Sequence, residues 1–162
     1  MVEFALKIVG SLSVVFVSLI YGRIKIRELR RQLDEISAFI SFVRYIGDNI
    51  EHFMKPIPEI VADFDNEYLA SCGFLDSARK FGLVSAWGSS ELFITGESRV
   101  LLGNYFSNAG GGYLEDEKRL ADYTVKRLSE ILKAETVASK DKERIYRTVP
   151  PMLAGSVVLI LI

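Results

Sequence analysis

The chain has very few of the side chains from which catalytic and metal sites are usually built. Its 162 residues include one cysteine, Cys72, and one histidine, His52. A single cysteine excludes an intrachain disulfide and fits a reducing compartment. A single histidine provides neither a His-based metal cluster nor a His-paired nucleophile relay. We therefore expect a non-enzymatic protein with no catalytic residues, no metal ligands and no cofactor.

Charge is missing from both ends of the chain. Residues 8–22 contain no ionisable side chain except Tyr21, and residues 148–162 contain none. Basic residues stand just inside each apolar end: Arg23, Lys25, Arg27, Arg30 and Arg31, and then Lys140, Lys142, Arg144 and Arg147. Basic residues that flank membrane spans stay on the cytoplasmic side. The pattern predicts a transmembrane helix at 1–22, a cytoplasmic helical domain at 23–148 and a short C-terminal transmembrane helix at 149–162, with both termini outside.

Each predicted span has an alternative. Residues 1–22 could be a cleaved signal peptide, but Glu3 and Lys7 make its start neutral and no small-residue cleavage site follows Ile20. Residues 149–162 form roughly 21 Å of helix, short of the roughly 30 Å hydrocarbon core. Pro150 and Pro151 can kink or restart that helix. The alternative is a helix buried in a soluble core, which the lack of a polar face over residues 157–162 disfavours.

Strand signals are scarce, and helical spacing dominates the middle of the chain. Apolar residues alternate steps of three and four along the first stalk: Ile26, Leu29, Leu33, Ile36, Ile40 and Val43. No helix breaker separates Gly22 from Gly47, so the first span should continue into this stalk. Residues 113–148, free of Gly and Pro, predict a second long helix with an apolar face of Leu114, Leu120, Tyr123 or Thr124, Leu128, Ile131 and Val137.

Short helices are expected between the two stalks, at residues 59–69, 74–84 and 91–106, the last interrupted by Gly96. Residues 91–95 are the one candidate strand, and we discount it. The fold class is therefore all-α: a membrane-anchored helical bundle in which two terminal transmembrane helices extend into long cytoplasmic stalk helices.

Two short motifs resemble ligand sites without meeting their requirements. Gly110, Gly111 and Gly112 lack the following Lys and Ser or Thr of a phosphate-binding loop, so they predict a flexible link. Residues 63–67 are acidic like a calcium loop, but Tyr68 stands where such a loop needs Gly and Phe74 where it needs Glu. The net charge of −1 gives no reason to expect nucleic acid.

Charge is unevenly distributed within the middle. Residues 23–31 carry five bases against Glu28, which favours contact with anionic membrane lipids. Residues 48–67 carry six acids against Lys55. The acidic stretch is either a solvated face or a docking surface for a basic cytoplasmic partner, with Asp63, Asp65 and Glu67 as candidate partner-binding residues.

From end to end, the chain resembles the stage III sporulation protein AB family of endospore-forming bacteria. The resemblance rests on the first span, the stalk at 27–33, the Pro56-Ile57-Pro58 step, Leu101-Leu102-Gly103, the Glu143-Arg144 pair and the apolar tail at 153–162. Leu102 stands where the family usually has Phe, residues 107–113 look longer than the family's turn, and Pro150-Pro151 is unusual.

The resemblance implies a non-enzymatic assembly subunit of the channel-like complex between mother cell and forespore, in the mother-cell membrane facing the forespore. It implies a cytoplasmic domain similar to type II secretion F proteins. The implied partners are the cytoplasmic ATPase of the complex, its other membrane components and membrane lipids, with Leu102 and Gly103 as further candidate contact residues.

Three alternatives remain at this point. One is an inner-membrane platform protein of a type II secretion or pilus system. Another is a membrane-anchored coiled-coil regulatory protein whose 26–43 seam pairs between chains. The third, a small membrane enzyme acting on lipid, is disfavoured because the two membrane boundaries offer mainly cations.

Overall fold

The computed structural model describes residues 2–161, and within them the side chains of residues 10, 13–153, 155 and 156. Over these residues the chain forms helices and no strands, which confirms the all-α prediction. The helices are α1 (Val2–Phe53), α2 (Ile57–Asp63), α3 (Glu67–Ser71), α4 (Phe74–Phe81), α5 (Leu83–Ser89), α6 (Gly96–Asn108) and α7 (Leu114–Leu161).

The chain divides into two compact units. We call Met1–Arg30 together with Thr136–Ile162 the terminal unit, and Arg31–Glu135 the central unit. The terminal unit contains the beginning of α1 and the end of α7, and the central unit contains the remaining helices.

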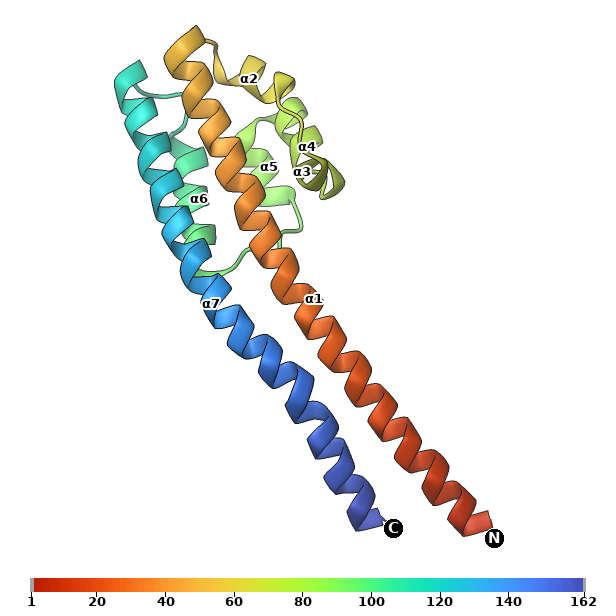
Figure 1. Cartoon of the computed structure of the whole chain (residues 1–162). Coiled ribbons are helices and arrows are strands. Elements are labelled where there is room, and N and C mark those ends of the chain that lie inside the picture. Colours follow the sequence, from red (N-terminus) through yellow and green to blue (C-terminus); the bar gives the residue numbers. More distant parts are fainter. Residues whose placement is uncertain (1, 162) are drawn as a thin grey trace. The chain divides into compact units, whose positions relative to one another are not determined.

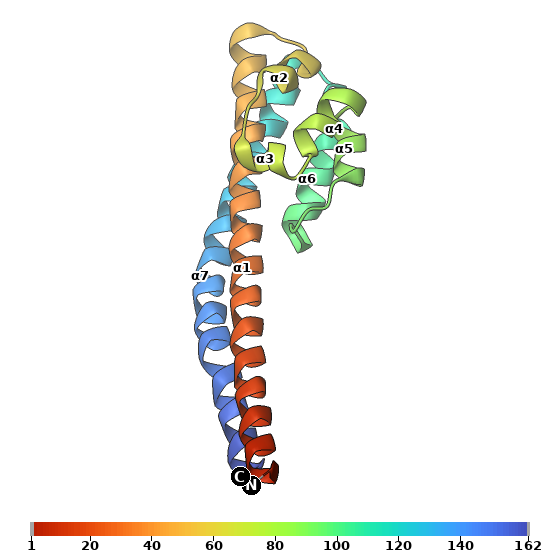
Figure 2. The same cartoon turned by 90° about the vertical axis from the view of Figure 1, so that its right-hand side faces the viewer.

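In the terminal unit, α1 and α7 run antiparallel as a pair (Figures 1 and 2). The helices approach closely at Gly22, where a Cβ would lie 2.6 Å from the carbonyl oxygen of Tyr146. Nearby, Arg30 Nη2 donates a hydrogen bond to Glu143 Oε1 at 2.7 Å. The helices can approach this closely because Gly22 has no side chain. Small residues allow the same close approach at other helix crossings.

Pro150 and Pro151 lie inside α7, which neither ends nor restarts there. Proline has no N–H, so the carbonyls of Tyr146 and Arg147, four residues earlier, lose their usual helical donors. The close passage of Gly22 over the Tyr146 oxygen therefore occurs where α7 has a carbonyl without its helical hydrogen bond.

Among the described residues, we find no helix with a stretch both long enough and apolar enough to pass through a bilayer. The spans predicted at 1–22 and 149–162 lie partly outside those residues. Met1 and Ile162 are not described, and neither are the side chains of residues 2–9, 11, 12, 154 and 157–161.

In the central unit, aromatic side chains from four helices form the middle of the core. Phe39 of α1 meets Phe74 of α4 and Trp87 of α5 edge-on, at ring-centroid distances of 5.0 and 5.6 Å. Phe106 of α6 lies 5.6 Å from Phe74 and 5.3 Å from Trp87. Such pairs contribute about 0.5–1.5 kcal/mol each beyond their buried area. They hold the short helices against α1.

The two long helices also pack together within the central unit. On α1, Ile36, Ile40 and Val43 of the predicted seam are buried. On α7, Thr124, Leu128 and Ile131 are buried, whereas Tyr123 is 58% exposed. Of the two residues that the spacing allowed on the buried face, Thr124 is therefore the one that lies there. At both ends the predicted apolar face is wrong, because Leu114 and Val137 are exposed. The Cβ of Ala121 would lie 3.1 Å from a Cβ built on Gly47.

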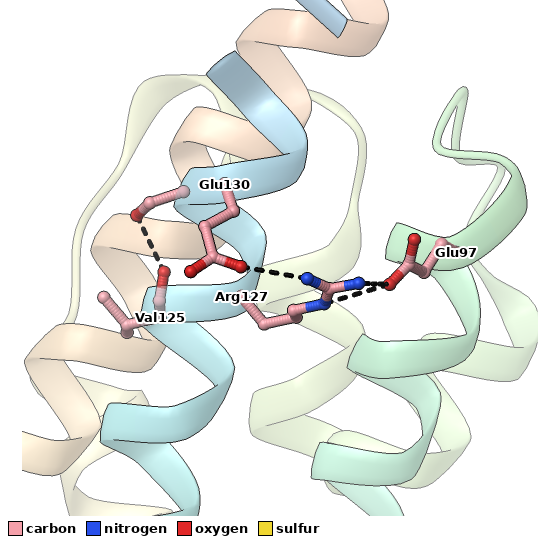
Figure 3. Close-up of polar contacts among 5 residues, drawn as sticks. Glu97, Val125, Arg127 and Glu130 are labelled. Carbon is pink, nitrogen blue, oxygen red and sulfur yellow. Dashed lines mark hydrogen bonds and ion pairs between the residues drawn. The ribbon is translucent and has the colours of Figure 1, made fainter. Parts of the chain in front are cut away.

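An exposed arginine joins α6 to α7. Arg127 of α7 donates from Nη2 and Nε to Glu97 Oε1 of α6, at 2.7 and 3.1 Å, and from Nη1 to Glu130 Oε2 at 2.9 Å (Figure 3). On the same stretch of α7, Ser129 Oγ donates to the carbonyl of Val125 at 2.7 Å. Exposed ion pairs contribute only about 0–1 kcal/mol. This arginine therefore aligns two helices that the core already holds.

Two of the short helices predicted from spacing are each divided in the structure. Residues 59–69 form α2 and α3 because Phe64 leaves the helix and Asn66 caps the next one, its side chain accepting from the N–H of Leu69 at 3.1 Å. Residues 74–84 form α4 and the start of α5 because Gly82 takes a φ of 82°.

The third short helix begins later than predicted. Residues 91–95 form neither helix nor strand, and α6 starts at Gly96, whose φ is 63°. The carboxylate of Glu35 in α1 accepts a hydrogen bond from the Ile94 N–H at 2.8 Å. That bond holds the segment in an extended path beside α1, so the predicted start of the helix at residue 91 is wrong.

Candidate functional site

The three acidic residues predicted to bind a partner lie close together along the chain and are all exposed. Asp63 ends α2, Asp65 follows in the connection and Glu67 begins α3. Asp63 pairs with Lys55, whose Nζ lies 2.8 Å from Asp63 Oδ2. Asp65 and Glu67 form no ion pair with any side chain that the structure describes. We call Asp63, Asp65 and Glu67 the acidic surface.

The connection that carries the acidic surface is fixed to the core. The ring of Phe64 is buried and lies 5.0 Å from the rings of both Phe42 and Tyr45. Arg79 of α4 donates from Nη2 to the carbonyl of Phe64 at 2.7 Å. A hydrogen bond from a charged donor is worth about 1.5–3 kcal/mol. The three carboxylates therefore lie on a short segment that the ring of Phe64 and the side chain of Arg79 attach to the core.

The other two candidate contact residues have different surroundings. Leu102 is fully buried in α6, so its side chain belongs to the core of the central unit. Gly103 is half-buried, and a Cβ there would lie 3.0 Å from Trp87 Nε1. Both residues pack within the α5–α6 region, and the structure does not bring them onto the acidic surface.

Eight of the nine basic residues that flank the predicted spans belong to the terminal unit. Arg23, Arg27, Arg30 and Arg147 line one cleft of about 500 Å³ together with Glu143. Lys25 is instead paired with Glu28, with Nζ 2.7 Å from Oε2. Arg144 is exposed and does not line this cleft. The ninth, Arg31, lies in the central unit with its guanidinium 5.4 Å above the ring of Phe93.

Glu35 is a buried acid that the sequence analysis did not identify. It is 1% exposed, and its carboxylate accepts the Ile94 N–H. Burial raises the pKa of the Glu35 carboxyl, while the N–H groups of Ile94 and Phe93 and the charge of Arg99 act in the opposite direction. One signal was available: Glu35 precedes Phe39, Phe42 and Ile46 at helical spacing, which places it on the buried face of α1.

Glu117 is a second buried acid without a role in the sequence analysis. Its Oε1 accepts hydrogen bonds from the N–H groups of Gly110 and Gly112, at 2.8 and 2.9 Å. Its Oε2 is buried and has no hydrogen-bond partner among the residues that the structure describes. The acid thus organises the glycine segment before α7, where the sequence predicts a flexible link.

The remaining chemically reactive residues are dispersed. His52 is exposed near the end of α1, and Cys72 is half-buried beside α3. Burial raises the pKa of the Cys72 thiol, so its reactive thiolate form is disfavoured. Within the described part of the chain, no three His, Cys, Asp or Glu side chains are grouped so that they could hold a metal ion.

Comparison of the chain with protein-family models, with curated proteins and with solved structures finds no match.

Proposed function

We propose that this chain is a non-enzymatic membrane subunit that couples a cytoplasmic secretion-type ATPase to the transenvelope complex between mother cell and forespore. In this proposal, residues 1–22 and 149–162 anchor the chain in the mother-cell membrane that faces the forespore. Both termini lie outside, and the central unit is cytoplasmic. The end-to-end resemblance to the stage III sporulation protein AB family supplies the identity of the complex.

One observation carries the membrane part of the proposal: arginines from both ends of the chain line the same cleft. Arg23 and Arg27 follow the first apolar segment, Arg147 precedes the second, and the two helices that carry them are paired. A membrane hairpin requires this coincidence, because both basic flanks must stay on the cytoplasmic side of one bilayer. Apolar residues continue beyond the arginines on each helix toward the chain ends.

The acidic surface supports the partner part of the proposal. Its three carboxylates are exposed, and among the described side chains only Asp63 of the three has an ion-pair partner. Complementary charge steers a basic partner and fixes its orientation. A short segment held by Phe64 and Arg79 would lose little conformational entropy on binding.

The coiled-coil regulatory alternative fits these observations less well. It needs the seam at residues 26–43 to face a second chain. In the central unit, Ile36, Ile40 and Val43 are already buried within one chain. In addition, Gln32 of α1 donates from Nε2 to Glu135 Oε2 of α7 at 3.1 Å. The contacts of this seam therefore favour an intrachain hairpin.

The experiment is to coexpress the full chain with the secretion-type ATPase of the sporulation complex and to measure the fraction of ATPase that sediments with membranes. The triple variant Asp63→Asn, Asp65→Asn, Glu67→Gln should lower that fraction several-fold, because it removes the charges of the acidic surface. Alkaline-carbonate extraction of the same membranes should leave the chain in the pellet.

The matched control is Glu91→Gln, Glu115→Gln, Asp122→Asn, which removes three exposed acids outside the acidic surface. This control should recruit the ATPase as well as the unmodified chain does. If both triple variants retain full recruitment, the proposed docking role of the acidic surface is wrong. If carbonate releases the unmodified chain, the membrane part of the proposal is wrong.

A further inference from the structure

We propose that the cleft between α1 and α7 in the terminal unit is a binding site for one anionic phospholipid, whose phosphate is held by Arg23, Arg27 and Arg147. This inference rests on the proposed membrane location. It goes beyond that location because it assigns a defined site to one lipid molecule, whereas the basic residues as a group predict only general attraction to an anionic surface.

The spacing of the arginines gathers positive charge into the cleft from two helices. Arg23, Arg27 and Arg30 follow one another at steps of four and three on α1, so they share one face of that helix. Arg147 faces the same cleft from α7. Guanidinium groups bind phosphate through paired N–H donors, and several of them around one cleft can hold a single phosphate from both sides.

The charges of the cleft are not balanced within the chain. Glu143 is the one carboxylate in the described lining, and it is paired with Arg30 at 2.7 Å. Among the side chains that the structure describes, Arg23, Arg27 and Arg147 take part in no ion pair and no hydrogen bond. Three guanidinium groups therefore face the cleft without an anion. A ligand phosphate would supply the missing charge.

The lining of the cleft becomes more basic along its length, as a phospholipid changes from acyl chains to a charged phosphate. Its lining extends along α1 from Ser18 to Arg30, over roughly 18 Å at the helical rise. Leu19 and Pro151 line the end nearer the apolar segments together with Ser18. The arginines line the rest together with Gly22, Ile26, Glu143 and Tyr146. A phosphate among the arginines would let the acyl chains leave past Leu19 and Pro151. A free phosphate ion would use only the polar part of the cleft.

The close contact at Gly22 holds α1 and α7 together where they line the cleft. Gly22 is buried and lines the cleft, and it packs against the backbone of Tyr146. The α1 and α7 arginines are thus attached to two helices that touch at this point. A phosphate would bind to donors whose backbones are already in place, which lowers the entropic cost of binding.

The test uses the full chain purified in a neutral detergent and titrated with phosphatidylglycerol, with bound lipid counted by native mass spectrometry. We expect one phosphatidylglycerol to bind in preference to phosphatidylcholine. The variant Arg23→Gln, Arg27→Gln, Arg147→Gln should weaken that binding at least about tenfold. The matched control Lys140→Gln, Lys142→Gln, Arg144→Gln removes three charges from the second basic cluster outside the cleft, and should weaken binding less than about twofold.

Three outcomes would overturn the lipid site alone. Equal weakening by the two triple variants would show general surface attraction. Inorganic phosphate or glycerol phosphate displacing the lipid at comparable concentrations would show a site for soluble phosphate. A chain that stays in carbonate-extracted membranes but binds no phosphatidylglycerol would remove the lipid site and leave the proposed function standing. Release of the chain by carbonate would instead remove the membrane basis of both proposals.

Discussion

Gly22 of α1 lies against the backbone carbonyl of Tyr146 in α7, at the carbonyl that Pro150 deprives of its helical donor. A Cβ on residue 22 would come within 2.6 Å of that oxygen. Real Cβ atoms do not approach a backbone oxygen so closely, and a backbone atom cannot rotate away as the end of a side chain can. The pairing of the two helices in the terminal unit therefore depends on glycine at this position.

The variant Gly22→Ala should lower the free energy of unfolding of the full chain by about 1–3 kcal/mol, since one helix must shift to admit the methyl group. Denaturation in mild detergent, followed by circular dichroism, measures the change. Gly10→Ala is the matched control, because a Cβ at Gly10 would meet no atom of the described part of the chain within 4 Å. The control should be neutral or up to about 1 kcal/mol more stable, since alanine favours helix. Equal losses in both variants would contradict the proposed contact.

Glu35 should make the stability of the central unit depend on pH. Because burial raises the pKa of this carboxyl above its ordinary value of 4.5, the folded chain binds the proton more tightly than the unfolded chain does. The stability from this group is therefore full below pH 4.5 and falls as pH rises toward the raised pKa. The unmodified chain should gain stability relative to Glu35→Gln as pH is lowered from 7 to 4, in urea denaturation.

A second substitution at this position tests the hydrogen bond rather than the charge. Glu35→Ala leaves the Ile94 N–H without its acceptor, which should cost about 1–3 kcal/mol and speed hydrogen exchange across residues 90–95. Asp34→Asn changes the exposed neighbouring acid and should affect neither measurement. Unchanged exchange in Glu35→Ala would mean that this carboxylate does not hold the segment.

Glu117 should be required for order in the glycine segment before α7. Glu117→Ala removes the acceptor of two backbone hydrogen bonds, so we expect a loss of about 2 kcal/mol in unfolding free energy and faster amide exchange at residues 110–112. Glu117→Gln keeps an oxygen acceptor and should lose less. Glu115→Ala removes an exposed acid and serves as control. Similar behaviour of the Glu117→Ala and Glu115→Ala variants would show that the two bonds contribute little.

The long helices were predictable because their signal repeats over many turns. The seam residues Ile36, Ile40 and Val43 recur at helical spacing, and each turn adds to the same inference. The short helices carry only one or two turns of pattern. There, local groups decide the boundaries: the Asn66 cap divides the helix predicted at 59–69, and Gly82 divides the next. Gly96 is read as an interruption from spacing alone, although α6 begins at that residue.

The acidic surface and Glu35 differ in how far the sequence predicts them. The acidic surface could be predicted because Asp63, Asp65 and Glu67 are neighbours in the sequence. The role of Glu35 could not, because its partner Ile94 is 59 residues away and contributes a backbone N–H that any residue would offer. The cleft lies between these cases. Its arginines were visible as two basic clusters, but only the pairing of α1 with α7 shows which of them share a space.

Trp87 is the only tryptophan in the chain, and it is packed among Phe39, Phe106 and Gly103 beneath the guanidinium of Arg99. Its indole therefore acts as a built-in optical probe of the central unit. The fluorescence of this indole should shift to longer wavelength when unfolding of the central unit exposes it to water. Because the terminal unit contains no tryptophan, this emission separates the melting of the central unit from events in the helix pair. No label has to be introduced.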